Sequence, residues 1–216
     1  MIVLGLTGSI AMGKSRVTTM FRAFGVPVFD ADAEVHALFA AGGAAVRPVL
    51  AAFPGCHDAG GGIDRGVLGR LVLGRPEELR RLESIVHPLV RSAEGQFLRR
   101  ACRAGARLVV LDIPLLFETG GEDRVDAVAL VSASTMLQGQ RALRRPGMTP
   151  AKLASIRRAQ LPDREKRKRA DFVIPSGYDR GATARNVRTV IAAAAVLRAR
   201  AWPTLWTKHA TGAPAR

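Results

Sequence analysis

The chain has 216 residues, 48% of them hydrophobic and 24% charged, which is enough apolar sequence for one compact domain with a real core. It contains no run of 18 apolar residues, no C-x-x-C pair and no basic signal segment at its start, so we expect a cytoplasmic protein with reduced thiols and no membrane span. The net charge is +15 and is unevenly distributed: residues 1–135 hold 15 Lys and Arg against 14 Asp and Glu, whereas residues 136–216 hold 18 against 4.

A phosphate-binding turn is predicted near the start of the chain. The stretch GSIAMGKS, residues 8–15, fits the pattern G-x-x-x-x-G-K-[S/T]. It follows the apolar, β-rich stretch IVLGLT and precedes KSRVTTMFRAF, which has helical spacing, so the strand-turn-helix context is present. In such a turn Gly8 and Gly13 let backbone N–H groups face an anion, Lys14 reaches the β- and γ-phosphates, and the Ser15 hydroxyl ligates Mg²⁺.

The segment after this helix predicts a short strand, two acids and a second helix. VPVF is the strand, and Asp30 or Asp32 is expected to cap the following helix. Residues 42–62 are rich in glycine and proline and predict a loop. Helical spacing then dominates residues 64–105, with Pro88 marking a break or a first-turn position.

The second half alternates strands and helices. ARLVVLDIPLLFE predicts a strand that ends at Asp112, and RVDAVALVSA and ADFVIP predict two more. Between the last two lie the helix STMLQGQRALRR and a basic helical stretch that reaches Arg169. A final helix is expected at about 180–200, and residues 204–216 are expected to form a weakly ordered tail.

Strands that alternate with helices predict an α/β fold, with a P-loop NTPase-type parallel sheet flanked by helices. Ligands of such sheets bind beyond the carboxyl ends of the strands. The turn at residues 8–15, Asp30, Asp32 and Asp112 all follow strand ends, so we expect them to contribute to one site.

Several stretches together resemble the dephospho-CoA kinase family: GLTGSIAMGKS, VPVFDADAEVHAL, IDRGVLGRLV, LRRLESIVHPLV, VVLDIPLLFE, QRALRRPGMT and RRAQLPDREKRKRADFVI. The resemblance implies transfer of the ATP γ-phosphoryl group to the ribose 3′-hydroxyl of dephospho-CoA, with Mg²⁺. It implies a single kinase domain over residues 1–203, with a helical substrate-binding insertion at about 60–105 and a lid at about 141–168.

The resemblance also assigns roles to individual residues. It makes Asp32 the group that accepts or orients the proton of the ribose hydroxyl, with Asp30 as the second choice; from spacing alone either could be only a helix cap. Lys14 and Arg141 join Asp32 as the catalytic residues. The ATP-binding residues are Gly8, Ser9, Ile10, Ala11, Met12, Gly13, Lys14, Ser15, Arg16, Arg141 and Arg145. The substrate-binding residues are Asp30, Asp32, Arg65, His87 and Asp112.

Some of these residues also have a physical basis for their assigned role, or an alternative to it. Arg141 and Arg145 are four residues apart and are expected on one helix face, at the start of the lid. Asp112 can hold Mg²⁺ through water, or can simply end a strand. His87 lies in an apolar setting and can be a structural histidine. The run REKRKR at residues 164–169 is expected to be a solvated face rather than a nucleotide contact.

The turn departs from the family's usual GGIGSGKST. Ala11 stands in place of a glycine, Met12 in place of a small residue, and Arg16 in place of a second hydroxyl residue. Ala11 and Met12 are expected to be tolerated if their φ angles are negative.

Three other functions fit the phosphate-binding turn less well. A kinase for a nucleoside monophosphate, shikimate or gluconate does not explain the HP and PLLFE stretches. A regulatory GTPase would need an N-K-x-D motif for guanine, which the sequence lacks. A nucleic-acid-binding ATPase could use the basic last third, but no recognition motif accompanies it. We therefore expect ATP and dephospho-CoA as partners, no nucleic acid or membrane, and a monomer.

Overall fold

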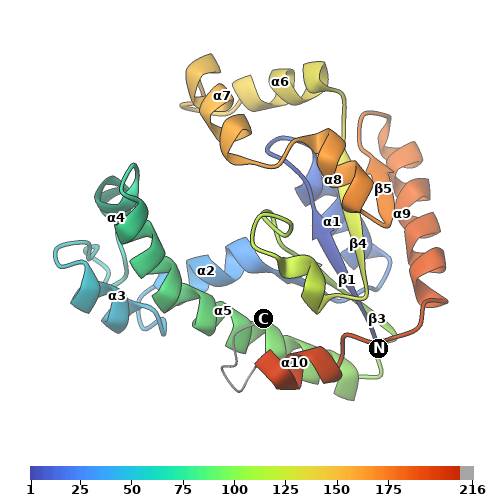
Figure 1. Ribbon diagram of the computed structural model, residues 1–216, viewed down its shortest axis with the longest axis horizontal. Helices are drawn as coiled ribbons and strands as arrows, with labels where there is room; N and C mark the ends of the chain where they lie inside the picture. Colours follow the sequence, from blue (N-terminus) through green and yellow to red (C-terminus); the bar gives the residue numbers. More distant parts are fainter. Residues whose placement is uncertain (210–216) are drawn as a thin grey trace. The chain divides into compact units, whose positions relative to one another are not determined.

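The computed structural model describes residues 1–209 and contains a five-stranded parallel sheet with the order β2-β3-β1-β4-β5 (Figure 1). The strands are β1 (Ile2–Thr7), β2 (Val28–Asp30), β3 (Leu108–Asp112), β4 (Ala127–Ser132) and β5 (Phe172–Pro175). The pairs β1–β3, β1–β4 and β4–β5 are parallel in register, so the expected sheet type and all five predicted strands are confirmed.

The helices were expected at most of the positions where they occur. They are α1 (Lys14–Ala23), α2 (Ala31–Phe39), α3 (Val46–Ala52), α4 (Arg65–Val72), α5 (Pro76–Arg103), α6 (Thr135–Leu143), α7 (Pro150–Ala159), α8 (Asp163–Arg169), α9 (Arg180–Ala195) and α10 (Thr204–His209), with a 3₁₀ helix η1 (Gly121–Arg124). Within residues 1–209, none of them is long and apolar enough to cross a membrane.

The chain divides into two compact units. The sheet unit comprises residues 1–29 and the chain from residue 98, and the helical unit comprises residues 30–97. The helical unit thus begins at Asp30, the last residue of β2, whereas the sequence suggested an insertion that begins at about residue 60. Residues 210–216 of the expected tail lie outside the described residues, and α10 forms a helix at Thr204–His209, where weak order was expected.

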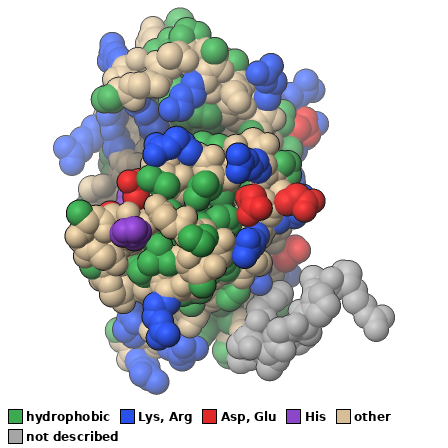
Figure 2. Space-filling model, turned by 90° about the vertical axis from the view of Figure 1, so that its left-hand side faces the viewer, with side chains coloured by type: hydrophobic (Ala, Val, Ile, Leu, Met, Phe, Trp, Pro, Cys, Tyr) green, Lys and Arg blue, Asp and Glu red, His purple; other side chains and the backbone are tan. Residues whose placement is uncertain are grey.

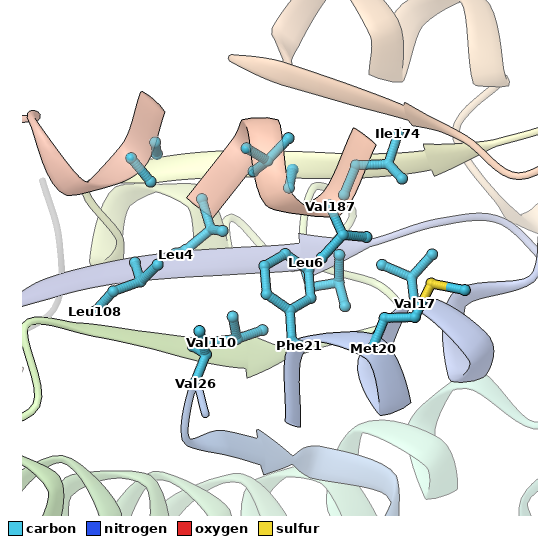
Figure 3. Close-up of a cluster of buried hydrophobic side chains, with 14 of the residues drawn as sticks. Leu4, Leu6, Val17, Met20, Phe21, Val26, Leu108, Val110, Ile174 and Val187 are labelled. Carbon is cyan, nitrogen blue, oxygen red and sulfur yellow. The ribbon is translucent and has the colours of Figure 1, made fainter. Parts of the chain in front are cut away.

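Side chains that alternate along the strands build the core of the sheet unit. From β1, Leu4 and Leu6 face α1 and α9, where they meet Phe21 and Val187 (Figure 3). A Cβ placed on Gly5, which points to the opposite face, would lie 3.0 Å from Leu116, so the segment that follows β3 covers that face. Successive residues of β1 face opposite sides of the sheet, and both sides are buried. For this reason β1 is apolar throughout.

Two predictions in the helical unit were wrong. The predicted loop at residues 42–62 contains α3, whose Pro48 lies in the first turn, where a missing N–H breaks no helical hydrogen bond. Val49 of this helix is fully buried. Helix α5 continues through Pro88 instead of breaking there. Apolar side chains on both sides of that proline, among them Val86 and Leu89, belong to the core of the unit, so packing outweighs the lost backbone hydrogen bond.

The basic run of α8 is a set of ion pairs rather than only a solvated face. Lys166 is fully buried, and its Nζ lies 2.8 Å from Oε1 of Glu118. Arg169 pairs with Glu122 and lies over the ring of Phe117 at 4.7 Å from its centroid. The other basic residues of the run remain exposed, namely Arg164, Arg167, Lys168 and Arg169. The expectation therefore fails at Lys166, because a buried cation needs a paired anion and Glu118 supplies it.

The backbone between β1 and α1 has one glycine requirement at each end. A Cβ on Gly8 would lie 2.8 Å from the carbonyl oxygen of Val131, so close approach to β4 demands glycine. Gly13 has φ 86°, a left-handed conformation that glycine adopts without strain. Ala11 has φ 59°, so the condition stated for its tolerance, a negative φ angle, is not met. The methyl group of Ala11 packs in a small apolar cluster with Ala142 and Leu153.

Removal of the charge partner of Lys166 should strongly destabilise the protein. We expect Glu118→Leu to lower the free energy of unfolding by about 3–5 kcal/mol, because it leaves an unpaired buried ammonium. Glu165→Leu is the matched control, since Glu165 pairs with the exposed Lys168, and should cost about 0–1 kcal/mol. Urea unfolding measures both values, and similar losses in the two variants would contradict the buried pair.

The strain and the packing of Ala11 should nearly cancel. Ala11→Gly loses a buried methyl and adds backbone entropy to the unfolded chain, together about 1.5 kcal/mol, but it relieves about 1–2 kcal/mol of left-handed strain. We therefore expect its free energy of unfolding to stay within about 0.5 kcal/mol of the unmodified value. Ala142→Gly, in the same apolar cluster but within a helix, should lose about 1.5 kcal/mol. Thermal and urea unfolding compare the pair, and equal losses would show that Ala11 is not strained.

Candidate active site

The N-terminus of α1 differs from those of most other helices. Side chains accept hydrogen bonds from the first turns of five helices: Asp30 for α2, Asp64 for α4, Ser134 for α6, Thr149 for α7 and Asp179 for α9. The N-cap of α1 is Gly13, which has no side chain to do this, and no acidic residue lies in the first turn. An anion bound there would receive backbone N–H groups and the positive end of the helix dipole.

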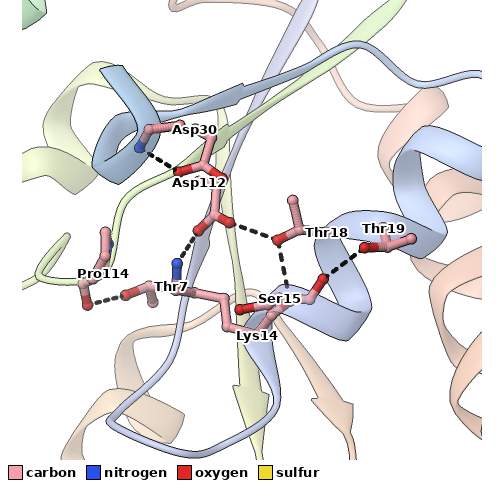
Figure 4. A network of polar contacts seen from close by, with 9 residues as sticks. Thr7, Lys14, Ser15, Thr18, Thr19, Asp30, Asp112 and Pro114 are labelled. Carbon is pink, nitrogen blue, oxygen red and sulfur yellow. Dashed lines mark hydrogen bonds and ion pairs between the residues drawn. The ribbon is translucent and has the colours of Figure 1, made fainter. Parts of the chain in front are cut away.

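A buried polar network joins this helix to the end of β3 (Figure 4). The ammonium of Lys14 forms an ion pair with Oδ1 of Asp112, and Thr18 Oγ1 donates a hydrogen bond to Oδ2 at 2.6 Å. Asp112 is only 2% exposed. Lys14 therefore lies at the carboxyl end of the sheet. If a phosphate replaced Asp112 as the partner of Lys14, the ammonium would still be paired with an anion.

Arg141 lies directly over the turn. Its Nη1 and Nη2 donate to the hydroxyl and the carbonyl oxygen of Ser176, at 3.1 and 2.7 Å, and the Ser176 hydroxyl donates to the carbonyl oxygen of Met12. A Cβ on Gly13 would lie 3.2 Å from Nη1 of Arg141. No sequence pattern pointed to Ser176, which follows β5 and is 164 residues from its partner Met12.

Burial, and to a smaller degree the positive charge of Arg16, lower the pKa of the Arg141 guanidinium. Both influences disfavour the cation, so an anion placed between the two arginines would be stabilised. Arg145 behaves differently, because α6 ends at Leu143 and Arg145 is exposed beyond the helix. The expectation that Arg141 and Arg145 share one helix face was therefore wrong.

In the helical unit, the two candidate acids have different surroundings. Asp30 is the N-cap of α2, and its Oδ1 accepts from the backbone N–H of Ala33 at 3.0 Å. Asp32 is exposed in the first turn of the same helix, two residues after β2 ends. The capping function therefore falls on Asp30, and Asp32 is not needed for it.

A second pair in the helical unit was not anticipated. Nη1 of Arg65, at the start of α4, donates to the imidazole ring of His36 and lies 2.8 Å from Nδ1 and 2.5 Å from Nε2. His36 is one helical turn after Asp32, so both lie on the same face of α2. Four-residue spacing from Asp32 is the sequence signal that could have pointed to His36. His87 is exposed on α5, which corrects the apolar setting expected for it.

Oxygen ligands suited to Mg²⁺ lie at the turn. Ser15 is the second residue of α1, and the Asp112 carboxylate already accepts hydrogen bonds from Lys14 and Thr18. Within residues 1–209, no group of three or more His, Cys, Asp or Glu side chains could hold a metal. Mg²⁺ commonly keeps waters and binds through one or two protein oxygens together with substrate phosphates. The donor set thus fits an ion that arrives with a nucleotide.

The excess of positive charge does not gather in one stripe on the face drawn in Figure 2, where Lys and Arg side chains stand in several separate groups. Several basic residues of the last third are held in ion pairs, among them Lys166, Arg167 and Lys168. This arrangement gives little support to a nucleic-acid track on that face.

Comparison with known proteins identifies relatives over most of the chain. Residues 2–179 match the family described as Dephospho-CoA kinase. A dephospho-CoA kinase from Rhodospirillum rubrum is 58% identical over 177 residues, covering 82% of this chain and 83% of the relative. A dephospho-CoA kinase from Mesorhizobium japonicum is 52% identical over 191 residues, covering 88% of this chain and 95% of the relative.

Solved structures agree with the fold. The protein TT1252 from Thermus thermophilus is 37% identical, with a TM-score of 0.76 over 89% of this chain and 97% of that one. A dephospho-CoA kinase from Campylobacter jejuni, at 21% identity, has a TM-score of 0.59 over 89% of this chain and 96% of that one, and shows the fold alone. Family match, high identity and coverage agree, and the chain belongs to the dephospho-CoA kinase family.

Proposed function

We propose that this protein transfers the γ-phosphoryl group of ATP to the ribose 3′-hydroxyl of dephospho-CoA, giving coenzyme A and ADP. The family match over residues 2–179 carries the choice of acceptor. The turn before α1, with its glycine N-cap and nearby Lys14, supports the ATP site. Among the alternatives, shikimate kinase from Aquifex aeolicus is a structural neighbour at 13% identity and a TM-score of 0.51, which concerns only the fold.

The phosphate side of the reaction depends on positioning and charge. In this proposal the backbone N–H groups of the turn and Lys14 hold the β- and γ-phosphates, and Arg141 neutralises charge that develops during transfer. Arg16, near enough to Arg141 to lower its pKa, contributes a second guanidinium. Arg145 approaches the phosphates only if the segment after α6 folds over them, as in a lid.

The acceptor side depends on the helical unit. We assign Asp32 as the base that orients the ribose hydroxyl and takes its proton as the oxygen attacks the γ-phosphorus and the bond to the β-phosphate breaks. Its exposure in the first turn of α2 supports this choice over Asp30, whose carboxylate caps the helix. Arg65, oriented by His36, is suited to the pyrophosphate of the acceptor, and His87 is a further acceptor-side contact.

Mg²⁺ would be held by the Ser15 hydroxyl and, through water, by Asp112, and it supplies neutralisation of phosphate charge when bound. The carboxylate of Asp112 is engaged with Lys14 and Thr18, which favours a water-mediated role for it. We further propose a cytoplasmic monomer that does not use nucleic acid as a partner.

The reaction is tested by following ADP release with Mg²⁺ and ATP, in the presence and absence of dephospho-CoA. We expect turnover that requires dephospho-CoA and yields coenzyme A, identified by mass spectrometry. Nucleoside monophosphates, shikimate and gluconate serve as competing acceptors. ATP consumption that ignores dephospho-CoA, or that prefers one of these acceptors, would refute the assignment.

Asp32→Asn should abolish most of the activity. We expect kcat to fall by about 10²–10⁴-fold, because an amide cannot take the proton, while the KM for ATP changes little. Glu34→Gln, in the same helix turn, is the control that should keep its activity. Asp30→Asn retains a good N-cap, so its kinetics report chemistry rather than folding. A collapse in Asp30→Asn together with normal rates in Asp32→Asn would move the base to Asp30.

Arg141→Lys should lower kcat by about 10²–10³-fold, because a lysine keeps the charge but loses the planar fork that contacts two oxygens. Arg144→Lys is the matched control, since Arg144 is exposed at the C-terminus of the same helix and has no assigned role. Steady-state kinetics at varied ATP separate kcat from KM. Equal effects in the two variants would remove Arg141 from the phosphate site.

A further inference from the structure

Both backbone polar groups of Ile10, in the middle of the phosphate-binding turn, form hydrogen bonds with glutamines that lie 128 and 150 residues further along the chain. Oε1 of Gln160 accepts from the Ile10 N–H at 3.1 Å. Nε2 of Gln138 donates to the Ile10 carbonyl oxygen at 3.0 Å. Gln138 lies in α6, and Gln160 directly follows α7. The turn is thus held by hydrogen bonds to Ile10, which occupies one of the unspecified positions of the pattern G-x-x-x-x-G-K-[S/T].

Chemistry fixes the orientation of both side-chain amides. Gln138 is 4% exposed, and its Oε1 accepts from Nε of Arg157 at 3.0 Å. A guanidinium only donates and a carbonyl only accepts, so the oxygen of Gln138 must face Arg157 and its nitrogen must face Ile10. Gln160 meets an N–H group, which only donates, so it must present its oxygen. The two glutamines therefore perform opposite tasks.

Apolar contacts join the same parts. The methyl of Ala11 packs against Ala142 of α6 and Leu153 of α7, with Met148 beside them. The helices α6 and α7 also contact each other. Any movement of the α6–α7 pair would therefore displace Ile10 and Ala11 within the proposed phosphate-binding turn.

We propose that Gln138 and Gln160 are positioning residues, which hold Ile10 between them so that the α6–α7 pair sets the shape of the turn and its affinity for the nucleotide. This rests on the proposed function of the turn as the ATP phosphate site. The pair and the turn then move as one body, and the glutamines act on the nucleotide only through Ile10.

Gln160 accepts a hydrogen bond from Ile10, whereas Gln138 donates one to it. Substitution of each glutamine by glutamate therefore tests the proposal, because glutamate can replace an acceptor but not a donor. Gln160→Glu keeps an oxygen for the Ile10 N–H, whereas Gln138→Glu loses the donor and turns a carboxylate toward a carbonyl oxygen. Both add the same charge near the turn, so charge alone cannot separate them. Gln140→Glu adds that charge at an exposed position of α6 and is the control. Gln160→Ala removes the acceptor at a partly exposed position. It keeps the proposal testable if the Gln138 variant does not fold.

Two readouts are needed, both on the full chain: the dissociation constant of ADP with Mg²⁺ by calorimetry, and hydrogen exchange of the Ile10 amide by NMR. We expect Gln138→Glu to bind ADP at least about tenfold more weakly than Gln160→Glu, as the loss of one buried hydrogen bond predicts. Exchange of the Ile10 amide should accelerate in Gln160→Ala but not in Gln160→Glu.

Equal ADP affinities for the two glutamate variants, or unchanged exchange in Gln160→Ala, would overturn the proposal. The exchange measurement needs no nucleotide, so it tests the hydrogen bond to the Ile10 amide independently of the reaction. Failure of the unmodified protein to bind ADP would instead refute the proposed function and, with it, the effect of the glutamines on affinity. Normal ADP binding without phosphorylation of dephospho-CoA would refute only the acceptor.

Discussion

The ion pair between Lys14 and Asp112 is the constraint on which the rest of the sheet unit depends. Both groups are largely withdrawn from water, with side-chain exposures of 16% and 3%, and removal of either would deprive the other of the ion pair that offsets its burial. Thr18 ties the second carboxylate oxygen to α1, so the turn leaves β1 and returns to the end of β3 along a fixed path. A phosphate that recruits Lys14 must compete with Asp112. Nucleotide affinity is therefore set by the difference between two strong attractions, not by the phosphate attraction alone.

The same turn is held on its outer side by groups that lie far away in the sequence. Ser176 hydrogen-bonds to Met12 across 164 positions, and Gln138 to Ile10 across 128. These groups come from the segments that follow β4 and β5, including the α6–α7 pair. The proposed phosphate-binding turn is therefore held by hydrogen bonds from the last third of the chain to its backbone. This gives that basic third a structural role beyond its charge.

The sequence was sufficient where a local pattern determines the structure. Alternating and continuous apolar stretches located all five strands, and the spacing of Gly8, Gly13 and Lys14 located the turn. Patterns failed where distant contacts decide. In α3, burial of Val49 outweighs a glycine- and proline-rich composition, and Lys166 is buried among otherwise similar basic residues because Glu118 lies opposite it. Nothing near either residue in the chain encodes its partner. The same holds for Ser176, Gln138 and Gln160, whose hydrogen bonds to the turn are all long-range.

Ala11 shows how a departure from a family pattern can be accommodated without loss of the site. Its left-handed backbone disfavours any side chain, which explains the glycine usual there. In this chain the methyl group enters an apolar cluster with Ala142 and Leu153, and the contact offsets strain of similar size. The cluster belongs to the same helices that carry the two glutamines. Alanine at position 11 therefore reduces the conformational freedom of the turn and attaches it to the α6–α7 pair. As a result, the conformation of the turn depends more on the position of that pair than it would with glycine at this position.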